Sequence, residues 1–126
     1  MSIVAGLVVI TTVGTEEQAN LLASELVSRR HAACVNIIPG LRSVYRWKGK
    51  ICRDTEFMLV VKTAEAEYPA VQAAMLELHG YELPEILAFK VCKGEERFLD
   101  WIAGSLDKKA VFSDEEEPEI LDETNF

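Results

Sequence analysis

The most informative pattern of hydrophobic and polar positions lies in residues 32–63. The first half of this segment is rich in Val, Ile and Tyr, which suit a pleated, half-buried surface. Residues 47–50 include Gly49, which can take the positive φ that a tight hairpin turn requires. The second half continues through an apolar run at 57–61. The segment therefore predicts one long β-hairpin with its turn at 47–50.

The second arm of this hairpin is apolar on both faces. Side chains alternate across a strand, so one face carries Phe57, Leu59 and Val61, and the other carries Met58 and Val60. A strand of this kind needs cover on both sides. A chain of 126 residues has little material for two covers, and a second copy of the chain is the natural candidate for one of them.

The first arm of the hairpin is interrupted by the dipeptide Pro39-Gly40. Proline has no amide hydrogen and cannot donate to a strand ladder. We therefore expect a bulge, a bend or an exposed edge at this point.

Periodic patterns flank the hairpin on both sides. Apolar runs predict strands, and apolar residues at steps of three and four predict helices. The predicted elements are a strand at 3–12, a helix at about 15–30, the hairpin, a helix at 64–79, a loop at 81–85, a strand at 86–92 and a helix through 98–106. This order predicts an α+β fold, a ferredoxin-like split βαβ sandwich with a long hairpin and an extra C-terminal helix. Both early helices then lie on one face of the sheet, so the third helix or a neighbouring subunit must cover the other.

Local signals mark the ends of the first two helices. Thr15 is expected as the N-cap of the first helix, with Gln18 completing a capping box. Pro69 is tolerated only in the first turn of the second helix, because it lacks an amide hydrogen. Gly80 follows His79 and is expected to end that helix as its C-terminal glycine.

Length and charge indicate one domain with a separate tail. A chain of 126 residues can bury one core and is too short for two domains. The net charge is −8, and residues 107–126 carry eight acids and two lysines, a balance of −6. We therefore expect a folded domain over residues 1–110 and a disordered acidic tail over 111–126, because dense like charge and few apolar residues oppose folding.

Composition also argues against several classes of protein. Residues 3–10 are apolar but too short to span a bilayer and lack a basic leader, so we expect a cytoplasmic protein without membrane contact. The three cysteines are far apart and form no CxxC pair, which favours reduced thiols. A modest basic cluster lies in the outer hairpin, at Arg42, Arg46, Lys48, Lys50 and Arg53. A solubilising fringe on exposed strands explains it, so no nucleic-acid partner is expected.

The sequence offers few residues that could form a catalytic or metal-binding site. The sequence contains no P-loop, GxGxxG, GxSxG or HExxH motif, and we expect no enzymatic activity. Of the two histidines, His31 follows the first helix, where its cation would suit the helix dipole. His79 precedes a loop that contains Tyr81, Glu82 and Glu85, and this loop is denser in polar side chains than a plain connector needs.

Two further residues each allow two interpretations. Cys34, at the start of the hairpin, is either a small buried hydrophobe or a soft metal ligand, because thiolate and imidazole together suit copper or zinc. Trp47, beside the hairpin turn, is either packed within the subunit or exposed at an interface. We expect an oligomer contact at Trp47.

Five segments carry a more specific resemblance. They are AACVNIIPG at 32–40, SVYRWKGK at 43–50, Lys62-Thr63, HGYELPE at 79–85 and FLDW at 98–101. In order and spacing they resemble the CutA family of divalent-cation tolerance proteins, over about residues 4–106. One departure is Gly80, where the family usually has proline.

The resemblance implies a ferredoxin-like subunit in a tight trimer whose long hairpins pair between subunits. It also implies a role in tolerance of copper and other divalent ions, and a likeness to the PII signalling trimers. By this resemblance Cys34 and His79 fall on positions discussed as metal ligands. Lys62, Tyr81 and Glu82 fall near the clefts between subunits.

These observations lead to one main hypothesis and two alternatives. The main hypothesis is a non-enzymatic homotrimer for divalent-cation tolerance that binds a divalent metal, above all Cu(II), through His79, Cys34 and Glu82. Imidazole, thiolate and carboxylate suit Cu(II), which heads the divalent affinity order. The expected cleft residues are Lys62, Tyr81, Trp47 and Glu85. The alternatives are a PII-like signalling trimer that binds a small anionic metabolite in inter-subunit clefts, and a structural protein that stabilises partners.

Overall fold

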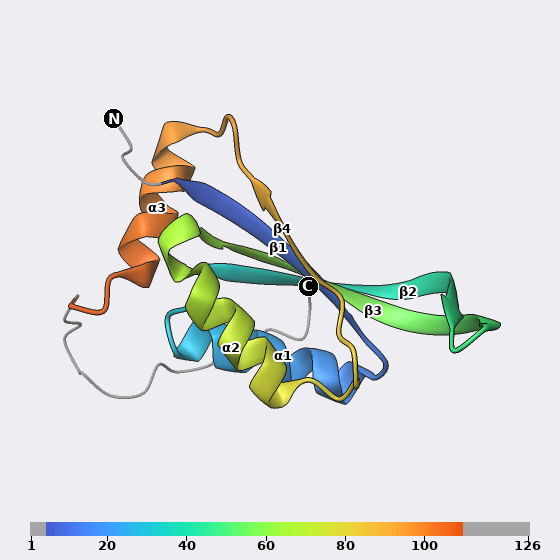
Figure 1. Ribbon diagram of the computed structural model, residues 1–126. Coiled ribbons are helices and arrows are strands. Elements are labelled where there is room, and N and C mark those ends of the chain that lie inside the picture. Colours follow the sequence, from blue (N-terminus) through green and yellow to red (C-terminus); the bar gives the residue numbers. More distant parts are fainter. Residues whose placement is uncertain (1–4, 110–126) are drawn as a thin grey trace.

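The computed structural model describes residues 5–109 (Figure 1). Its elements are β1 (Gly6–Val13), α1 (Glu16–Ser28), β2 (Cys34–Trp47), β3 (Lys50–Ala64), a short 3-10 turn (Glu65–Glu67), α2 (Tyr68–Leu78), β4 (Ile86–Lys90) and α3 (Glu96–Leu106). The order of elements is the predicted one. The expected disordered tail, 111–126, lies outside the described residues.

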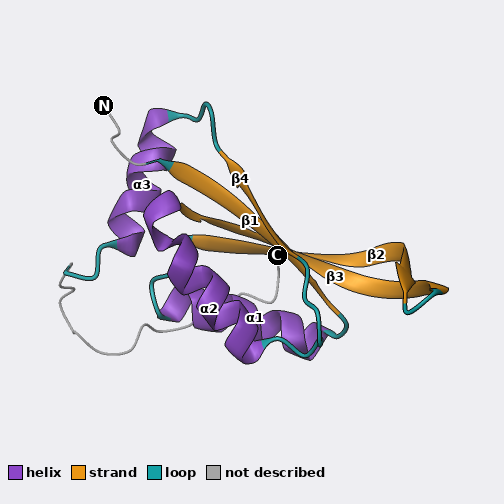
Figure 2. Cartoon of the chain, viewed as in Figure 1, coloured by secondary structure: helices purple, strands orange, loops and turns teal. Residues whose placement is uncertain are grey.

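The four strands form one antiparallel sheet in the order β2-β3-β1-β4. Helices α1 and α2 lie together on one face of this sheet, and the β2-β3 hairpin extends well beyond the body of the subunit (Figure 2). This is the predicted ferredoxin-like α+β fold with a long hairpin and a C-terminal helix.

The core lies between the sheet and the two helices. Alternate residues of the central strands, including Val9, Leu59 and Val61, are fully buried against Leu22 of α1 and Met75 of α2. Burial of apolar side chains of this size contributes roughly 1.5–3 kcal/mol each. The helix-facing side of the sheet therefore supplies the main stabilisation of the subunit.

The opposite face of the sheet is apolar and mostly uncovered. By strand alternation and register it carries Val8, Ile10, Ile38, Met58, Val60, Leu87 and Phe89. Ile38, Leu87 and Phe89 are 45%, 51% and 53% exposed. Helix α3 packs at one end of this face, where Ile102 and Leu106 contact Ala64. The two-sided apolar pattern of β3 is thus confirmed, and the third helix covers only part of the second side.

A β-bulge interrupts the pairing of β2 with β3 at the predicted position. Ile38 pairs with Met58, but the next pair is Leu41 with Glu56, so β2 contains one extra residue. Gly40 absorbs this residue with φ of +73°, a conformation that L side chains rarely adopt. Because side chains alternate with a period of two, one inserted residue moves every later side chain of β2 to the other face.

The hairpin turn also requires left-handed backbone. Lys48 and Gly49 have φ of +50° and +77°. Positive φ at both central residues is the geometry of a two-residue type I′ turn, which matches the twist of the flanking strands. The sequence predicted this turn through Gly49 alone, and Lys48 adopts the same region without the freedom of glycine.

The predicted helix signals are confirmed in part. The Thr15 side chain accepts a hydrogen bond from the Gln18 amide at 3.1 Å, but the Gln18 side chain donates to the Leu78 carbonyl rather than back to the cap. Helix α2 ends at His79-Gly80, as expected. The cap is not a left-handed glycine, however, because His79 adopts an extended conformation, with φ of −73° and ψ of 142°, and Gly80 has no positive φ.

We predict that Gly40→Ala destabilises the protein by about 1–2 kcal/mol, the cost of a side chain in left-handed backbone. Gly104→Ala is the matched control, because Gly104 lies within α3 and an added Cβ there meets no atom within 4 Å. The control should stabilise the protein by about 0.5–1 kcal/mol, since alanine favours helix over glycine. Urea unfolding of both variants measures these changes, and a loss in Gly104→Ala equal to that in Gly40→Ala would contradict the role of the bulge.

Candidate functional site

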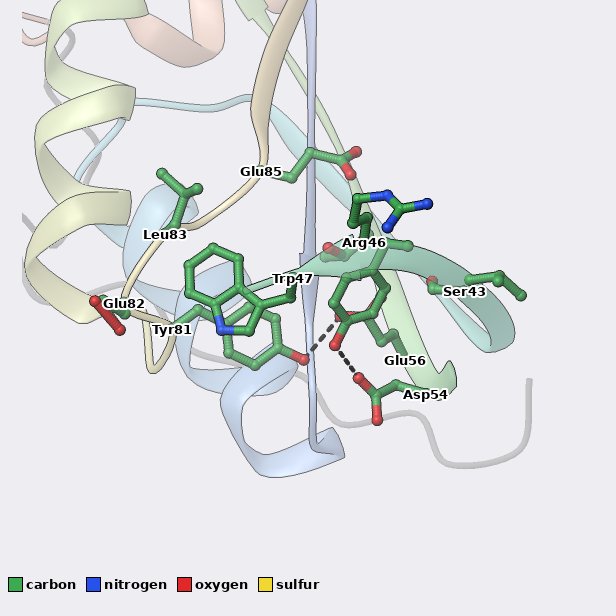
Figure 3. Close-up of a pocket in the computed structure, with 12 residues that line it drawn as sticks. Ser43, Arg46, Trp47, Asp54, Glu56, Tyr81, Glu82, Leu83 and Glu85 are labelled. Atoms are coloured by element: carbon green, nitrogen blue, oxygen red, sulfur yellow. Dashed lines mark hydrogen bonds between the residues drawn. The ribbon is translucent and has the colours of Figure 1, made fainter. Parts of the chain in front are cut away.

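A hollow lies between the outer hairpin and the loop that follows α2. Its volume is about 590 Å³, within the range of small-molecule sites. One wall comes from the hairpin and the other from residues 81–85, as Figure 3 shows. The lining consists of Thr12, Ser43, Val44, Tyr45, Arg46, Trp47, Asp54, Glu56, Tyr81, Glu82, Leu83 and Glu85. We call this hollow the hairpin cleft.

The β-bulge decides which hairpin residues face the cleft. After the bulge Leu41 pairs with Glu56, so Tyr45 and Trp47 share a face with Glu56 and Asp54. The same face of β3 continues into Met58 and Val60. The hairpin cleft therefore opens on the side of the uncovered apolar sheet face.

Two tyrosine–carboxylate hydrogen bonds organise the cleft. The Tyr81 hydroxyl donates to Glu56 Oε2 at 2.8 Å, and the Tyr45 hydroxyl donates to Asp54 (Figure 3). Burial and the bond to Glu56 hold the pKa of Tyr81 above its usual range. The bond to Asp54 raises the pKa of Tyr45 to about 12. Both hydroxyls therefore keep their protons at neutral pH and continue to donate them.

Glu56 is the unusual member of this group, because its side chain lies deep in the structure. The residue is only 6% exposed. Its oxygen Oε2 accepts from Tyr81, and no positively charged side chain in the described part of the chain forms an ion pair with it. A buried carboxylate without a cationic partner is costly, and the hydrogen bond from Tyr81 offsets part of this cost.

His79 lies beside the hairpin cleft and is fixed through both ring nitrogens. Nε2 lies 2.9 Å from the Thr12 carbonyl oxygen and 3.2 Å from Thr11 Oγ1, while Nδ1 accepts from the Tyr81 amide at 3.1 Å. The carbonyl can only accept and the amide can only donate. The neighbours therefore assign a neutral imidazole with its proton on Nε2.

Burial supports the same protonation state. It lowers the pKa of His79, although the Thr12 carbonyl and the Glu56 charge partly oppose this shift. The ring also lies against that of Tyr81, with centroids 5.1 Å apart. His79 is thus a neutral, oriented imidazole at physiological pH, and its only lone pair is shared with one backbone amide.

The structure brings together most of the predicted site residues, but not all of them. Trp47, Tyr81, Glu82 and Glu85 line the hairpin cleft, and His79 lines a smaller adjoining hollow with Tyr81. The predicted cleft residue Lys62 pairs with Cys34 at the other end of the sheet.

Cys34 does not meet His79 within one subunit. The Cys34–Lys62 row of the sheet continues to Val8 on β1, whereas His79 bonds to Thr12. Four residues of strand separate these rows, about 13 Å. Among residues 5–109 no three His, Cys, Asp or Glu side chains converge as a metal cluster.

Sequence reasoning missed Tyr45, Asp54, Glu56 and Thr12. Glu56 pairs with Leu41 across the hairpin, and its hydrogen bond is to Tyr81, which is 25 residues away in the sequence. Thr12 acts through its backbone carbonyl, which no side-chain pattern reveals.

Comparison with known proteins identifies the family of this chain. The sequence pattern of the CutA1 divalent ion tolerance protein matches residues 7–105. The chain belongs to the CutA1 family. A divalent-cation tolerance protein CutA from Thermus thermophilus is 45% identical over 95 residues, which cover 75% of this chain and 92% of that protein.

Two further comparisons involve CutA proteins of rice. The chloroplastic protein CutA 1 of Oryza sativa is 38% identical over 102 residues, which are 81% of this chain but only 58% of that protein. The crystal structure of CutA1 from Oryza sativa superposes with a TM-score of 0.81 at 37% identity and covers 83% of this chain and 96% of the crystallised one. The fold of this chain is therefore the CutA ferredoxin-like fold.

Family membership bears on three of the expectations from sequence. CutA1 proteins are divalent-cation tolerance proteins and not enzymes, which confirms the expected absence of enzymatic activity. No helix in the described range 5–109 is long and apolar enough to cross a membrane. The rice relative is named as chloroplastic, so the family name alone does not fix a compartment, and a cytoplasmic location stays a prediction.

We predict that the free energy of unfolding falls as the pH drops from 7.5 to 5.5, in part because of His79. The folded state lowers the pKa of His79, whereas the unfolded chain binds the proton near pH 6.5. The contribution of His79 is therefore fully present above about pH 6.5 and is lost as the pH falls toward the lowered folded value.

The test is urea unfolding across this pH range in the parent and in His79→Gln, which should show a flatter slope. His31→Gln is the matched control, since His31 lies beside Glu67 and away from these contacts. Equal slopes in the parent and in His79→Gln would contradict the assignment.

Proposed function

We propose that this chain acts in divalent-cation tolerance as a homotrimer that binds divalent metal, above all Cu(II), beside the hairpin cleft. His79 is the principal ligand and Glu82 supplies an oxygen. Cys34 completes the site only if a neighbouring subunit brings it there, because the two residues lie apart within one subunit. Tyr81, Trp47 and Glu85 form the cleft around the metal.

The orientation of His79 carries the proposal for metal binding. Histidines that bind metals usually donate their second ring N–H to a carbonyl or carboxylate, which fixes the tautomer and the ring. His79 has this arrangement, with Nε2 directed at the Thr12 carbonyl. A metal ion at Nδ1 would take the place of the Tyr81 amide, which now donates to that lone pair. The neutral imidazole needs no further loss of a proton before it binds.

The uncovered face of the sheet supports the proposal of an oligomer. A row of apolar side chains that includes Leu87 and Phe89 is half exposed, and exposed apolar patches of this kind mark interaction surfaces. Contact between this face and a different surface of the next subunit is heterologous, and such contacts form a closed ring where the rotation between subunits closes. A ring of three copies is the assembly that the resemblance to the family implies, and in it the hairpin cleft would lie beside the interface.

The signalling alternative rests on Lys62. Its side chain shares the uncovered face with Met58 and Val60, so an anionic metabolite would bind there, between subunits. The hairpin cleft itself suits an anion poorly, because four carboxylates line it against one guanidinium. The metal hypothesis therefore has the stronger support.

For the oligomer, we expect sedimentation equilibrium at micromolar concentration to give three times the mass of the chain, with no folded monomer. Obligate interfaces are large and hydrophobic, so dissociation should coincide with unfolding. Phe89→Lys should lower the mass, because it places a charge on the uncovered face. Leu76→Lys is the matched control, since Leu76 is equally exposed on the outer side of α2, and it should remain trimeric. A folded monomer of the parent protein would refute the trimer.

For the metal, we expect calorimetric titration of the apo protein with Cu(II) to show binding that His79→Ala weakens by at least tenfold. Glu82→Gln should weaken Cu(II) binding less than His79→Ala does. Loss of Cu(II) affinity in Cys34→Ala would indicate that a second subunit contributes a ligand. Binding should weaken below about pH 6.5, where protons compete for the imidazole. Affinity in His31→Ala should equal that of the parent. If His79→Ala and Cys34→Ala both bind copper like the parent, the site is wrong.

A further inference from the structure

Besides Glu82, one of the proposed metal ligands, many other side chains line the hairpin cleft. Its walls contain three aromatic side chains, Trp47, Tyr45 and Tyr81, and four carboxylates. Aromatic faces and carboxylates both attract cations. Arg46 is the one cationic side chain among the lining residues, so carboxylates outnumber cations four to one in the walls.

The chemistry of the walls points to an organic cation rather than to a bare metal ion. A metal ion needs several ligands that converge within about 2.0–2.6 Å of one point, and no such cluster of three occurs among residues 5–109. Asp54 and Glu56 already accept hydrogen bonds from tyrosines. The carboxylates are distributed around a cleft of about 590 Å³. This arrangement suits a larger cation that carries several separated positive charges.

Glu56 supplies the second, independent observation. Among residues 5–109, Tyr81 is the one hydrogen-bond partner of the Glu56 carboxylate, and it bonds Oε2. No fully enclosed side-chain oxygen or nitrogen in the described part of the chain lacks a partner, so Oε1 is not fully enclosed. A residue that is 94% buried and lines the cleft thus keeps one carboxylate oxygen without a partner.

We propose that the hairpin cleft binds an aliphatic polyammonium cation. One ammonium group bonds Glu56 Oε1 and lies against the rings of Tyr81 and Trp47. The methylene chain packs along the aromatic wall, and a second ammonium group reaches Glu85 or Glu82 on the opposite loop. These two loop carboxylates are exposed and form no ion pair within the described residues.

This inference does not depend on copper binding at His79. It predicts that the cleft binds a polyammonium cation in metal-free protein, whereas the proposed function predicts that the protein binds a metal ion at His79. A failure of either one is therefore visible on its own.

The experiment is isothermal titration of the full-length protein, in its native oligomeric state and in excess EDTA, with spermidine and 1,4-diaminobutane. Both polyamines should bind, the triamine spermidine more tightly than the diamine, and affinity should fall as the salt concentration rises. The neutral isostere 1,4-butanediol and the dianion succinate should not bind. Binding of succinate but not of the two polyamines would overturn the proposal in favour of an anion site.

Variants locate the site. Glu56→Gln keeps an oxygen for Tyr81 but removes the charge, and we expect it to weaken spermidine binding about tenfold, the size of one charge-assisted hydrogen bond. Glu85→Gln lies on an exposed loop and tests the opposite wall without endangering the fold. Glu17→Gln is the matched control, because it removes one charge from exposed helix α1, away from the cleft. Equal weakening in Glu17→Gln and in both cleft variants would show attraction to net charge alone and would overturn the proposal.

Discussion

The hairpin cleft depends on one inserted residue in β2. Successive side chains of a strand point to opposite faces of the sheet. One additional residue therefore moves every later side chain to the other face. The bulge at Gly40 makes this reversal and sends Tyr45 and Trp47 to the face that carries Asp54 and Glu56. Without the bulge the aromatic side chains and the carboxylates would lie on opposite faces of the hairpin, and the cleft would lose one wall. The conformational freedom of a single glycine thus underlies the chemistry of the site.

The second wall of the cleft is fixed from the other side of the subunit. The loop after α2 is held by His79, whose ring joins the end of β1 through the Thr12 carbonyl and the loop through the Tyr81 amide. Tyr81 then extends across the cleft to Glu56 on the hairpin. A chain of hydrogen bonds therefore connects β1, the loop and β3. When one member of such a network is removed, more than one contact is lost. A substitution at His79 should therefore also weaken the hydrogen bond between Tyr81 and Glu56.

The subunit has an imbalance that assembly would relieve. One face of the sheet buries a well-packed core, while the other leaves apolar side chains such as Ile38 and Phe89 half exposed. The same side of the sheet carries the open mouth of the cleft. Assembly of subunits through this face would bury apolar surface and place a neighbour beside the carboxylates. In the proposed oligomer, assembly and ligand binding would be linked by geometry, because each copy would border the site of another.

The sequence alone determined the architecture of this protein. Periodicity, the cap at Thr15, Pro69 in a first turn and Gly49 in a hairpin turn are local signals. They predicted the order of the elements, the long hairpin and the place where its first arm is interrupted, while the family was inferred from the resemblance of five longer motifs. Local reasoning also predicted the end of helix α2 at His79-Gly80, but not its form, because His79 is extended there and Gly80 has no positive φ.

The site was decided by tertiary structure. The pairing of Tyr81 with Glu56 joins residues 25 positions apart, and the contact of His79 with Thr12 joins residues 67 apart. These contacts depend on the strand order, on the register shift at the bulge and on the path of a loop. None of these is encoded in the pattern of any one segment, because each arises only when distant segments pack against one another.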